Sequence, residues 1–487
     1  MINPSYLHEH SRASAGGPLL YKMKTWLIVA AVVSLNAGAV EVTPRDSVVV
    51  DVVVVGAGSA GVPAAIQSGR LGAKTVLVES GPLLGGNLTL GGVEHPIPFR
   101  KNGNTVIAGI GLEWTLKSIA LGHGAEIERR TGKPFEPEHA ALKEGYDPWT
   151  FLCVGEEMLR EAGVDLRYYE TPVKVEKLAP PNVCNWRVVT GAQGGVREIL
   201  CRQLVDATGN GCLAEMCGAT FLPMDSENQP GSFHYGITGM PSWKQISREL
   251  VEKKYAEAME KGLLQEGDTH GDKFGPLQIL RWPASNYMYG ADNTTSESRT
   301  RTNMRGRASA LRILRFIRSL PGGEAARISW MSAEVGVRET RCVKGLVVMN
   351  IHDFTAGRVW DDSISYATWF IDFHVRKWQG YALPPGVRPI GPDVYPTIPF
   401  RALVPAGVDN LLVAGRCLSA DRLTMSSVRV CAPAMATGQA AGCAAALAAK
   451  AGKTPAALDM AVLKKTLAAH GQVIPSKGLF SSVNKGI

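Results

Sequence analysis

Residues 51–61 read DVVVVGAGSAG, an apolar run rich in β-branched residues that leads directly into a GxGxxG motif. In this motif Gly56 permits a tight turn, Gly58 lets the backbone approach a pyrophosphate, and Gly61 lets a helix pack closely on the preceding strand. The N-terminus of that helix then faces the phosphate groups. The pattern predicts a strand, a turn and a helix that together bind a dinucleotide.

A second apolar run ends in an acidic residue. The run is TVLV, residues 75–78, and Glu79 follows it, 18 residues after Gly61. A carboxylate at this position can accept hydrogen bonds from both hydroxyls of an adenosine ribose. From these two runs we predict that the cofactor contacts Gly56, Gly58, Ser59, Ala60, Gly61, Glu79 and Ser80.

A glycine pair, Gly85–Gly86, lies in the segment SGPLLGGNLT, residues 80–89. This composition is typical of a loop rather than of a helix or a strand. We expect the loop to lie over the cofactor, where its backbone amides and Asn87 reach the pyrophosphate and the ribityl chain. In NAD enzymes a helix usually follows the second strand at once, so the loop favours FAD.

Two later segments look like strands that complete the same domain. They are RQLVDATG, residues 202–209, and NLLVAGR, residues 410–416. Each alone could be an ordinary strand followed by a turn, but their order in one chain favours a flavin domain. A further strand at residues 168–175 would bring the backbone of Val173 to the adenine. At the ends of the two later strands we predict cofactor contacts through Ala207, Thr208, Gly209, Gly415 and Arg416.

The small-residue segment APAMATGQAAGCAAAL, residues 432–447, predicts a helix with Pro433 in its first turn. The positive end of this helix would point at the flavin and stabilise charge on the ring. Arg429 precedes the helix and is predicted to lie near the ring. Gly438 and Gly442, four residues apart, predict a smooth helix face that packs on the sheet.

With these segments identified, the sequence resembles a family of FAD-dependent oxidoreductases. The flavin domain of that family is loosely related to the flavin-binding chain of heterodisulfide reductase and, more distantly, to fumarate reductase and aspartate oxidase. The resemblance covers residues 48–474 and is carried by VVVVGAGSAGVPAAI, LLGGNLTLGG, DATGNGCLAE, EVGVRETR, DNLLVAGRCLSA, SSVRV and MATGQAAG. It implies FAD but no particular reaction. The chain lacks the iron–sulfur cysteine motifs of heterodisulfide reductase, which argues against a role in electron bifurcation.

The expected fold is α/β, with a discontinuous Rossmann-like FAD-binding domain of the glutathione-reductase type. Its pieces are residues 48–221 and 397–450. An inserted α+β substrate lobe covers residues 222–396, because this segment is too long for a loop. A C-terminal helix and tail cover residues 451–487. Helices within these parts are expected at residues 243–263, 300–320 and 456–470.

Composition limits the function classes. A chain of 487 residues with 45% hydrophobic content can bury a large core. A net charge of +8 without a lysine or arginine block argues against a nucleic-acid partner. The nine cysteines include no CxxC pair, so neither dithiol chemistry nor a metal site is predicted. We expect most of these cysteines to be buried.

The N-terminal region bears on localisation. From Met23 the chain reads MKTWLIVAAVVSLNAGAVEV, with an apolar stretch and an A-x-A site at residues 37–39. This pattern is typical of a signal peptide, residues 23–39, and predicts a secreted or periplasmic protein. The apolar run is shorter than the about 20 residues of a membrane span, so none is expected after cleavage. Residues 1–22 would then be an extension before the true start. The alternative is a tail followed by a buried strand or an anchor helix, and without a signal the protein would be cytoplasmic.

His374 and Asp372 are candidates for acid–base chemistry on a substrate. They alternate in FIDFH, residues 370–374, so on a strand they would share one face, and the carboxylate would set the tautomer of the imidazole. The pair could remove a hydroxyl proton from a small organic substrate while a hydride leaves. The alternative is a core histidine satisfied by its neighbour. His95, which follows the glycine-pair loop, could also approach the ring.

Two arginines in GVRETR complete the catalytic candidates. Arg338 or Arg341 could bind a carboxylate or an oxyanion of the substrate. Either could instead form a structural ion pair, with Glu334 or Glu339 as the partner.

Three function classes remain open at this point. The first is an FAD-dependent dehydrogenase or oxidase, in which a substrate hydride passes to flavin N5 and the electrons go on to oxygen or another acceptor. The second is a flavin monooxygenase, which usually has Gly-Asp where this chain has Gly415–Arg416. The third is a flavin-binding protein without catalysis.

Overall fold

The β-branched run at the start of the GxGxxG motif forms the centre of the main sheet. Strand β1 (Ser47–Val55) is buried over its last four residues and pairs in parallel with β2 (Thr75–Glu79) and β8 (Gly195–Asp206). The computed structural model describes residues 44–480 except 94–95, 132–145, 225–226, 243, 270–275, 282–285, 375–382 and 384. The predicted signal peptide and His95 therefore lie outside the described residues.

The main sheet combines parallel and antiparallel pairing. Its other strands are β5 (Asp165–Tyr168), β6 (Thr171–Lys177), β7 (Trp186–Ala192) and β13 (Leu411–Val413). The order is β5-β2-β1-β8-β7-β6, and β13 also pairs with β8. Strand β8 has two partners on one side, because residues 195–201 pair antiparallel with β7 and residues 204–206 pair in parallel with β13. A segment from late in the chain therefore completes a sheet that begins at the N-terminal end.

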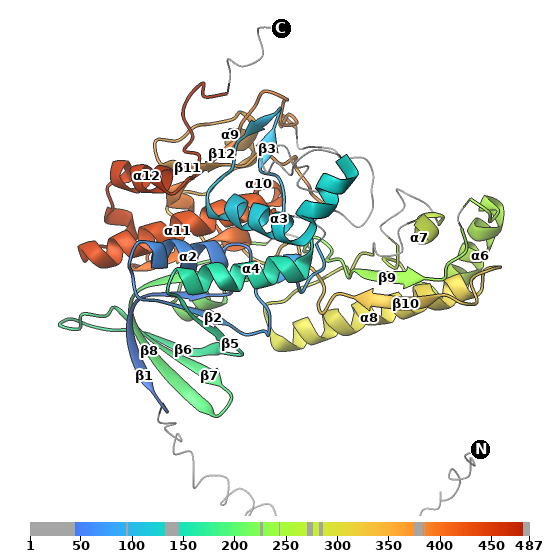
Figure 1. The fold of residues 1–487 in the computed structure, drawn as a ribbon, viewed down its shortest axis with the longest axis horizontal. Coiled ribbons are helices and arrows are strands. Elements are labelled where there is room, and N and C mark those ends of the chain that lie inside the picture. The colour runs from blue at the N-terminus through green and yellow to red at the C-terminus, as the bar shows by residue number, and fades with distance from the viewer. Residues whose placement is uncertain are drawn as a thin grey trace, which may run out of the picture. The chain divides into compact units, whose positions relative to one another are not determined.

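Helices cover one side of this sheet (Figure 1). The described helices are α2 (Gly61–Arg70), α3 (Ile110–Thr131), α4 (Pro148–Glu161), α5 (Cys212–Met216), α6 (Arg248–Glu260), α7 (Gln278–Arg281), α8 (Ser296–Arg318), α9 (Ile351–Thr355), α10 (Arg422–Val428), α11 (Cys431–Ala451) and α12 (Met460–Ala469). Of these, α6, α7 and α8 lie away from the sheet, with β9 (Tyr235–Thr238) and β10 (Arg327–Met331). Helices α2, α3, α4 and α11 pack against one another. The α/β prediction is confirmed.

Shorter elements connect these parts. Antiparallel pairs are formed by β3 (Arg100–Lys101) with β4 (Asn104–Thr105), β9 (Tyr235–Thr238) with β10 (Arg327–Met331), and β11 (Ser363–Tyr366) with β12 (Thr397–Pro399). Turns of 3-10 helix are η1 (Gly86–Leu88), η2 (Phe400–Leu403), η3 (Gly415–Cys417) and η4 (Pro455–Ala457).

The three additional helices predicted from the sequence are present with shifted ends. Helix α8 begins at Ser296 rather than near residue 300, because Thr295 and Ser298 form a capping box. Helix α6 begins at Arg248, after Ser247 accepts a hydrogen bond from the amide of Leu250. The predicted 456–470 helix divides into η4 and α12.

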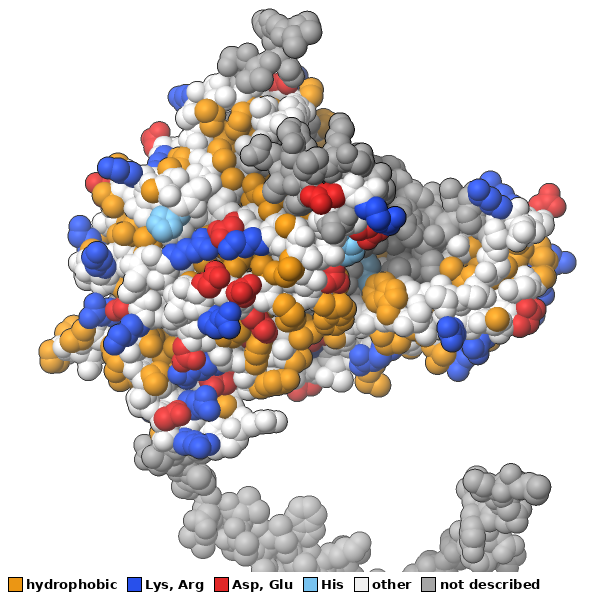
Figure 2. Space-filling view, viewed as in Figure 1, with side chains coloured by type: hydrophobic (Ala, Val, Ile, Leu, Met, Phe, Trp, Pro, Cys, Tyr) orange, Lys and Arg blue, Asp and Glu red, His pale blue; other side chains and the backbone are white. Residues whose placement is uncertain are grey.

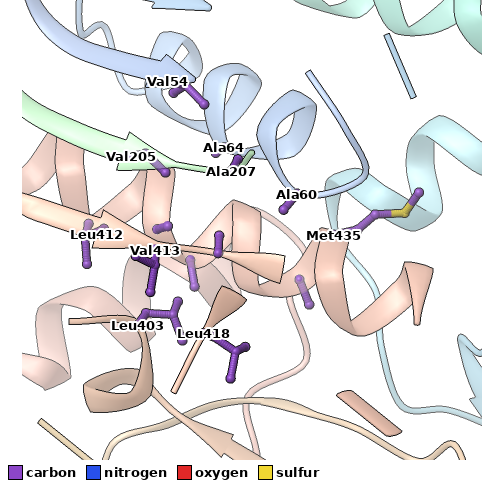
Figure 3. Close-up of a cluster of buried hydrophobic side chains, with 14 of the residues drawn as sticks. Val54, Ala60, Ala64, Val205, Ala207, Leu403, Leu412, Val413, Leu418 and Met435 are labelled. Carbon is purple, nitrogen blue, oxygen red and sulfur yellow. The ribbon is translucent and has the colours of Figure 1, made fainter. Parts of the chain in front are cut away.

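The glycines of α11 pack on a helix rather than on the sheet, so that part of the prediction was wrong. A Cβ atom on Gly438 would lie 1.9 Å from the carbonyl oxygen of Ala60, and one on Gly442 would lie 2.0 Å from that of Ala64. Both carbonyls belong to the N-terminal part of α2. Figure 3 shows Ala60 and Ala64 in the same buried cluster as Val413 and Met435. Bare glycine backbone lets the two helices approach this closely.

Two hydrophobic clusters form the interior. The larger cluster holds the main sheet, α2, α11 and also apolar residues between 342 and 371. The smaller cluster lies entirely between residues 233 and 337 and is built by α6, α8, β9 and β10. Part of the segment expected as a substrate lobe, 222–396, thus packs with the sheet. The proposed domain boundaries remain a prediction.

Figure 2 shows Lys and Arg side chains interspersed with Asp and Glu on the face that it presents. All nine cysteines are free thiols, and Cys153 alone is exposed. Among the described residues no single helix is long and apolar enough to cross a membrane, although α10 and α11, bent by 91° at their junction, pass the same test as a pair.

Candidate FAD and substrate site

A cavity of about 540 Å³ lies at the carboxyl ends of β1, β2 and β8. Its wall includes Gly56 and Gly58 from the turn after β1, Glu79 and Ser80 from the end of β2, Gly86 and Asn87 from the glycine loop, Ala207 and Thr208 from the end of β8, and Arg416 from η3. Ligand sites of open α/β sheets occur at this edge. The structure thus brings these nine predicted cofactor residues together around one cavity.

The three motif glycines have different neighbours. Gly56 has φ +95°, a conformation that other residues rarely adopt. A Cβ atom on Gly61 would lie only 1.7 Å from the carbonyl oxygen of Gly56, whereas one on Gly58 would meet nothing within 4 Å. Gly61 is therefore required for packing of the turn, and Gly58 keeps open the space beside the cavity.

At the start of α2 the amide of Val62 donates to the carbonyl of Gly58 at 3.2 Å, and Pro63 has no amide hydrogen, so within the first turn the amide of Gly61 is the one left for an anion. Helix α2 begins at Gly61, and its N-cap residue Ala60 makes no side-chain capping bond. The first amides of a helix have no partner within the helix, and the helix dipole adds partial positive charge there. The hydroxyl of Ser59 interacts with the thiol of Cys431, the first residue of α11. The turn before α2 and the start of α11 thus lie close together, although no residue of α11 lines the described cavity. That α11 points at the flavin stays a prediction.

Glu79 is held at the cavity wall by backbone amides. Its carboxylate accepts hydrogen bonds from the amides of Ala57 and Gly81, each at 2.7 Å, and one from the Ser80 hydroxyl at 3.2 Å. A carboxylate has about four acceptor sites, so capacity remains for hydroxyl groups of a ligand. This arrangement fits the role predicted from the sequence.

The glycine loop lies on the first turn, as expected. The amide of Gly85 donates to the carbonyl of Ala57 at 2.7 Å, and a Cβ atom on Gly86 would lie 3.1 Å from the Cα atom of Gly58. Asn87 donates from Nδ2 to the carbonyl of Val337 at 3.4 Å. The loop therefore joins the dinucleotide turn to the segment that carries Arg338.

Arg416 connects three segments in addition to lining the cavity. Its guanidinium donates to the carbonyl of Gly209 at 2.8 Å, to the carbonyl of Val337 at 2.5 Å and to Oδ1 of Asn210 at 2.7 Å. Burial lowers the pKa of Arg416 to about 10. Gly209 and Gly415 do not line the described cavity and act through the backbone of these turns.

Val173, the residue predicted to contact the adenine, does not line the cavity. Glu170, Thr171 and Pro172 line the cavity, whereas Val173 is outside the lining and its side chain is 55% exposed. The single strand expected at residues 168–175 is instead the end of β5 and the start of β6, separated at Tyr169, which has φ +57°. Val173 as an adenine contact stays a prediction.

The cavity also contains an unsatisfied polar atom. Oδ1 of Asn293, a lining residue from the segment before α8, is buried and has no hydrogen-bond partner in the described structure. A buried polar atom without a partner is costly, and a ligand with several hydroxyl groups relieves that cost. The donors and acceptors around the cavity, together with the space beside Gly58, fit FAD.

Asp372 and His374 are brought together, although not on a strand. Residues 367–374 form no strand, yet Nε2 of His374 lies 2.9 Å from Oδ1 of Asp372. The loop is held by Arg429, which donates to the backbone carbonyl of Asp372 at 3.0 Å and to its carboxylate at 3.3 Å. Tertiary contacts therefore produce the pairing that strand alternation was expected to produce.

Tyr287, which was not among the residues predicted from the sequence, completes a hydrogen-bonded chain. The oxygen of Tyr287 lies 2.6 Å from Nδ1 of His374. No local signal pointed to this tyrosine, which lies 87 residues before the histidine. Within the described residues, His374 thus has both ring nitrogens engaged, one by a carboxylate and one by a phenol.

The charges around this chain keep the imidazole neutral. Burial and the nearby Arg338 lower the pKa of His374 from 6.5 to about 4, although Asp372 opposes the shift. Burial alone would raise the pKa of Asp372, but His374, Arg429 and Arg338 hold it well below its usual range. Burial also raises the pKa of Tyr287. At neutral pH the chain is therefore a carboxylate, a neutral imidazole and a protonated phenol.

The two candidate arginines have different surroundings. Arg338 donates to the carbonyl of Pro230 at 2.5 Å and lies over the ring of Tyr287, 5.5 Å from its centre. Arg341 forms a two-pronged ion pair with Glu215, at 2.8 and 2.6 Å, and covers the ring of Phe221. The structure places Arg338 in the cluster with His374 and places Arg341 outside it.

The prediction that Glu334 or Glu339 forms an ion pair with one of these arginines was wrong. Glu334 pairs with Arg299, and Glu339 pairs with Arg422. Spacing along the sequence cannot separate these possibilities, because the side chains involved come from segments that meet only in the folded chain.

The shifted pKa of His374 predicts a specific pH dependence of stability. In the unfolded chain the imidazole takes up a proton near pH 6.5, whereas in the native state it does so only near pH 4. Stability therefore falls as the pH drops through this range, by about 1.4 kcal/mol per pH unit for one histidine. For His374→Gln we expect the loss between pH 7 and pH 4.5 to be about 2 kcal/mol smaller than in the unaltered protein.

Urea unfolding at the two pH values measures this loss. The matched control is His352→Gln, because His352 is exposed. Equal losses in His374→Gln and in the unaltered protein would contradict a buried neutral imidazole at position 374.

Comparisons with known proteins place this geometry in a family. Residues 51–467 match the family described as FAD dependent oxidoreductase. No curated protein matches the chain. OxyS anhydrotetracycline hydroxylase from Streptomyces rimosus is 14% identical with a TM-score of 0.36, and the match covers 87% of this chain and 66% of that chain, slightly less than two thirds. p-Nitrophenol 4-monooxygenase PnpA from Pseudomonas putida DLL-E4 is 13% identical with a TM-score of 0.37. That match covers 88% of this chain and 85% of that chain.

The match to the family spans most of the chain and includes every motif of the cavity. The resemblance inferred from the sequence is confirmed, and so is FAD as the cofactor. This protein belongs to the FAD dependent oxidoreductase family and is a flavoenzyme.

Proposed function

We propose that this protein oxidises a small hydroxyl-bearing organic molecule, and that Tyr287, His374 and Asp372 accept the hydroxyl proton. The observation that carries the proposal is the hydrogen-bonded chain from the phenol through the imidazole to the carboxylate. The three residues do not line the described cavity, but they are linked to it through Arg338, which directly follows Val337, whose carbonyl accepts from the cavity residues Arg416 and Asn87. Bound FAD supplies the acceptor for the substrate hydride at N5.

The hydrogen bonds assign the direction of proton movement. Asp372 accepts only if Nε2 of His374 carries the proton, so Nδ1 is the acceptor and the Tyr287 hydroxyl donates to it. The substrate proton then passes to the Tyr287 oxygen while the phenol proton moves to Nδ1 of His374. The carboxylate of Asp372 stabilises the imidazolium that forms. His374 thus acts through Tyr287 rather than on the substrate directly.

We also propose a more specific fold for the chain. A glutathione-reductase-type FAD domain with an inserted substrate lobe is supported by the parallel β5-β2-β1-β8-β13 arrangement and its antiparallel β6–β7 extension. The separate hydrophobic cluster between residues 233 and 337 supports the lobe. The electron acceptor after FAD is oxygen or another molecule, and the N-terminal signal pattern supports export.

Anaerobic reduction of the bound flavin tests the function. The holoenzyme is mixed with glycolate, lactate, glycerol, benzyl alcohol or glucose, and the loss of flavin absorbance is followed in time. For a compound that reduces the flavin, we expect Tyr287→Phe to slow the reduction about 100-fold, the lower range for loss of an acid–base group. Tyr289→Phe is the matched control, because its ring packs edge-on against that of Tyr287.

Other results would favour the alternatives. Reduction by NADPH alone, followed by oxygen-dependent hydroxylation of an aromatic compound, would indicate a flavin monooxygenase. No reduction by any of these compounds would leave a flavin-binding protein without catalysis. Equal rates in Tyr287→Phe and Tyr289→Phe would contradict the proton path.

A further inference from the structure

Arg338 is a partly buried cation without an ion-pair partner among the described residues. Its contacts are a hydrogen bond to the carbonyl of Pro230 and the face of the Tyr287 ring. The carboxylate of Asp372, which is nearby, is engaged by His374 and Arg429. Among the described residues Asp372 is thus a single carboxylate that acts on both Arg338 and Arg429, so positive charge is in excess here. A buried charge in excess is costly, which points to a ligand of opposite charge.

The charge of Arg338 acts on several neighbours. Burial and Arg338 lower the pKa of His234 to about 4, as they do for His374. Burial and Arg429 lower the pKa of Arg338 itself to about 10. His234 and His374 are therefore neutral at pH 7 and do not add to the positive charge, mainly because they are buried and secondly because of Arg338.

We propose that Arg338 binds a carboxylate of the substrate and that the substrate of the proposed oxidation is therefore a small hydroxy acid. The hydroxyl part of this inference rests on the proposed function, whereas the carboxylate part rests on Arg338. A guanidinium has five donors in a planar fork that matches a carboxylate in two parallel hydrogen bonds. One of these donors is used by Pro230.

The position of Arg338 also connects the two ends of such a substrate. Its guanidinium lies against the ring whose hydroxyl meets His374. A molecule held by its carboxylate at Arg338 therefore presents a neighbouring hydroxyl to Tyr287. In the reaction the C–H hydrogen leaves as a hydride to FAD, and the O–H proton passes to Tyr287. The product is the corresponding oxo acid, and the carboxylate is unchanged.

Binding of carboxylates to the holoenzyme tests the inference without a known substrate. The probes are acetate and benzoate, each compared with its neutral amide, acetamide or benzamide. Binding is followed by the change in flavin absorbance and by calorimetry. We expect the holoenzyme to prefer each carboxylate to its amide. In Arg338→Gln we expect the carboxylate dissociation constant to rise about 10-fold to 100-fold, the range for loss of a charge-assisted hydrogen bond.

Arg341→Gln is the matched control, since Arg341 comes from the same segment but pairs with Glu215. Its carboxylate affinity is expected to remain unchanged. Arg338→Lys keeps the charge but loses the planar fork, so an intermediate affinity is expected, and this variant covers the case in which Arg338→Gln fails to fold. As a second readout, NMR titration should show that benzoate raises the pKa of His374, because the bound anion offsets the charge of Arg338.

Two results would overturn the inference: equal affinity for carboxylates and amides, or equal carboxylate affinity in Arg338→Gln and Arg341→Gln. These results are distinct from failure of the proposed function, which is shown by the absence of flavin reduction. If the holoenzyme binds carboxylates through Arg338 but is reduced by none of the hydroxy compounds, the carboxylate site is supported and the proposed oxidation is contradicted. If glycerol or glucose reduces the flavin and the holoenzyme shows no preference for carboxylates, the oxidation is supported and the carboxylate site is contradicted.

Discussion

Gly58→Ala is expected to weaken FAD binding about 300-fold while leaving the stability of the apoprotein unchanged. The new Cβ atom would meet nothing within 4 Å in the protein, so the fold accommodates it. Gly58 lines the cavity, however, and the motif requires close approach of this backbone to the pyrophosphate. A steric cost and a lost charge-assisted hydrogen bond together amount to about 3.4 kcal/mol, which corresponds to this factor.

Titration of the apoprotein with FAD measures the affinity, and urea unfolding of the apoprotein measures the stability. Gly61→Ala is the informative comparison, because its Cβ atom would lie 1.7 Å from the Gly56 oxygen and must disturb the turn itself. We expect Gly61→Ala to lower both quantities and Gly58→Ala to lower only the first. Unaltered FAD affinity in Gly58→Ala would mean that the cofactor does not approach this turn.

Gly438→Ala is expected to destabilise the protein by about 4 kcal/mol or to prevent folding. Its Cβ atom would lie 1.9 Å from the carbonyl oxygen of Ala60, and backbone cannot move aside as a side chain can. Overpacking between two rigid helices falls at the upper end of measured costs. Ala60 is also the N-cap of α2, so relief of the clash would displace the helix end that is predicted to face the phosphates.

Urea unfolding of the apoprotein checks this expectation as well. Gly122→Ala is the matched control, because Gly122 is exposed in the long helix α3 and a Cβ atom there meets only the side chain of Thr150, at 3.3 Å. Alanine favours a helix over glycine by about 1 kcal/mol, so the control should be neutral or more stable. Equal stability of the two variants would show that α2 and α11 are not in the close contact described.

Local patterns predicted the dinucleotide half of the site well. The β1 run, the glycine turn, the α2 start and Glu79 follow one another within 29 residues, 51 to 79, and their positions depend on hydrogen bonds and sterics between near neighbours. The glycine loop was predictable for the same reason, since Gly85 bonds to Ala57. Val173 shows the limit, because the strand expected at residues 168–175 divides between β5 and β6 and Val173 lies outside the cavity lining.

The substrate half was predicted only in part. His374 and Asp372 are two residues apart, and their pairing could be guessed, although the loop that pairs them depends on Arg429. Tyr287 could not be found, because it reaches His374 from 87 residues away. Arg341 and Arg338 lie three residues apart and looked equivalent, yet one meets Glu215 and the other meets the Tyr287 ring.

The sequence alone thus established an α/β flavoprotein, its FAD motif and its family, since these depend on short-range order along the chain. The tertiary structure assigned the partners of the charged groups, because a long side chain pairs with whichever oxygen the fold brings within about 3 Å. It also showed that the glycines of α11 meet α2, because contact between two helices depends on the packing of the whole core. Arg338 was distinguished from Arg341 only by these long-range contacts, which leave one cation with a carboxylate and the other without.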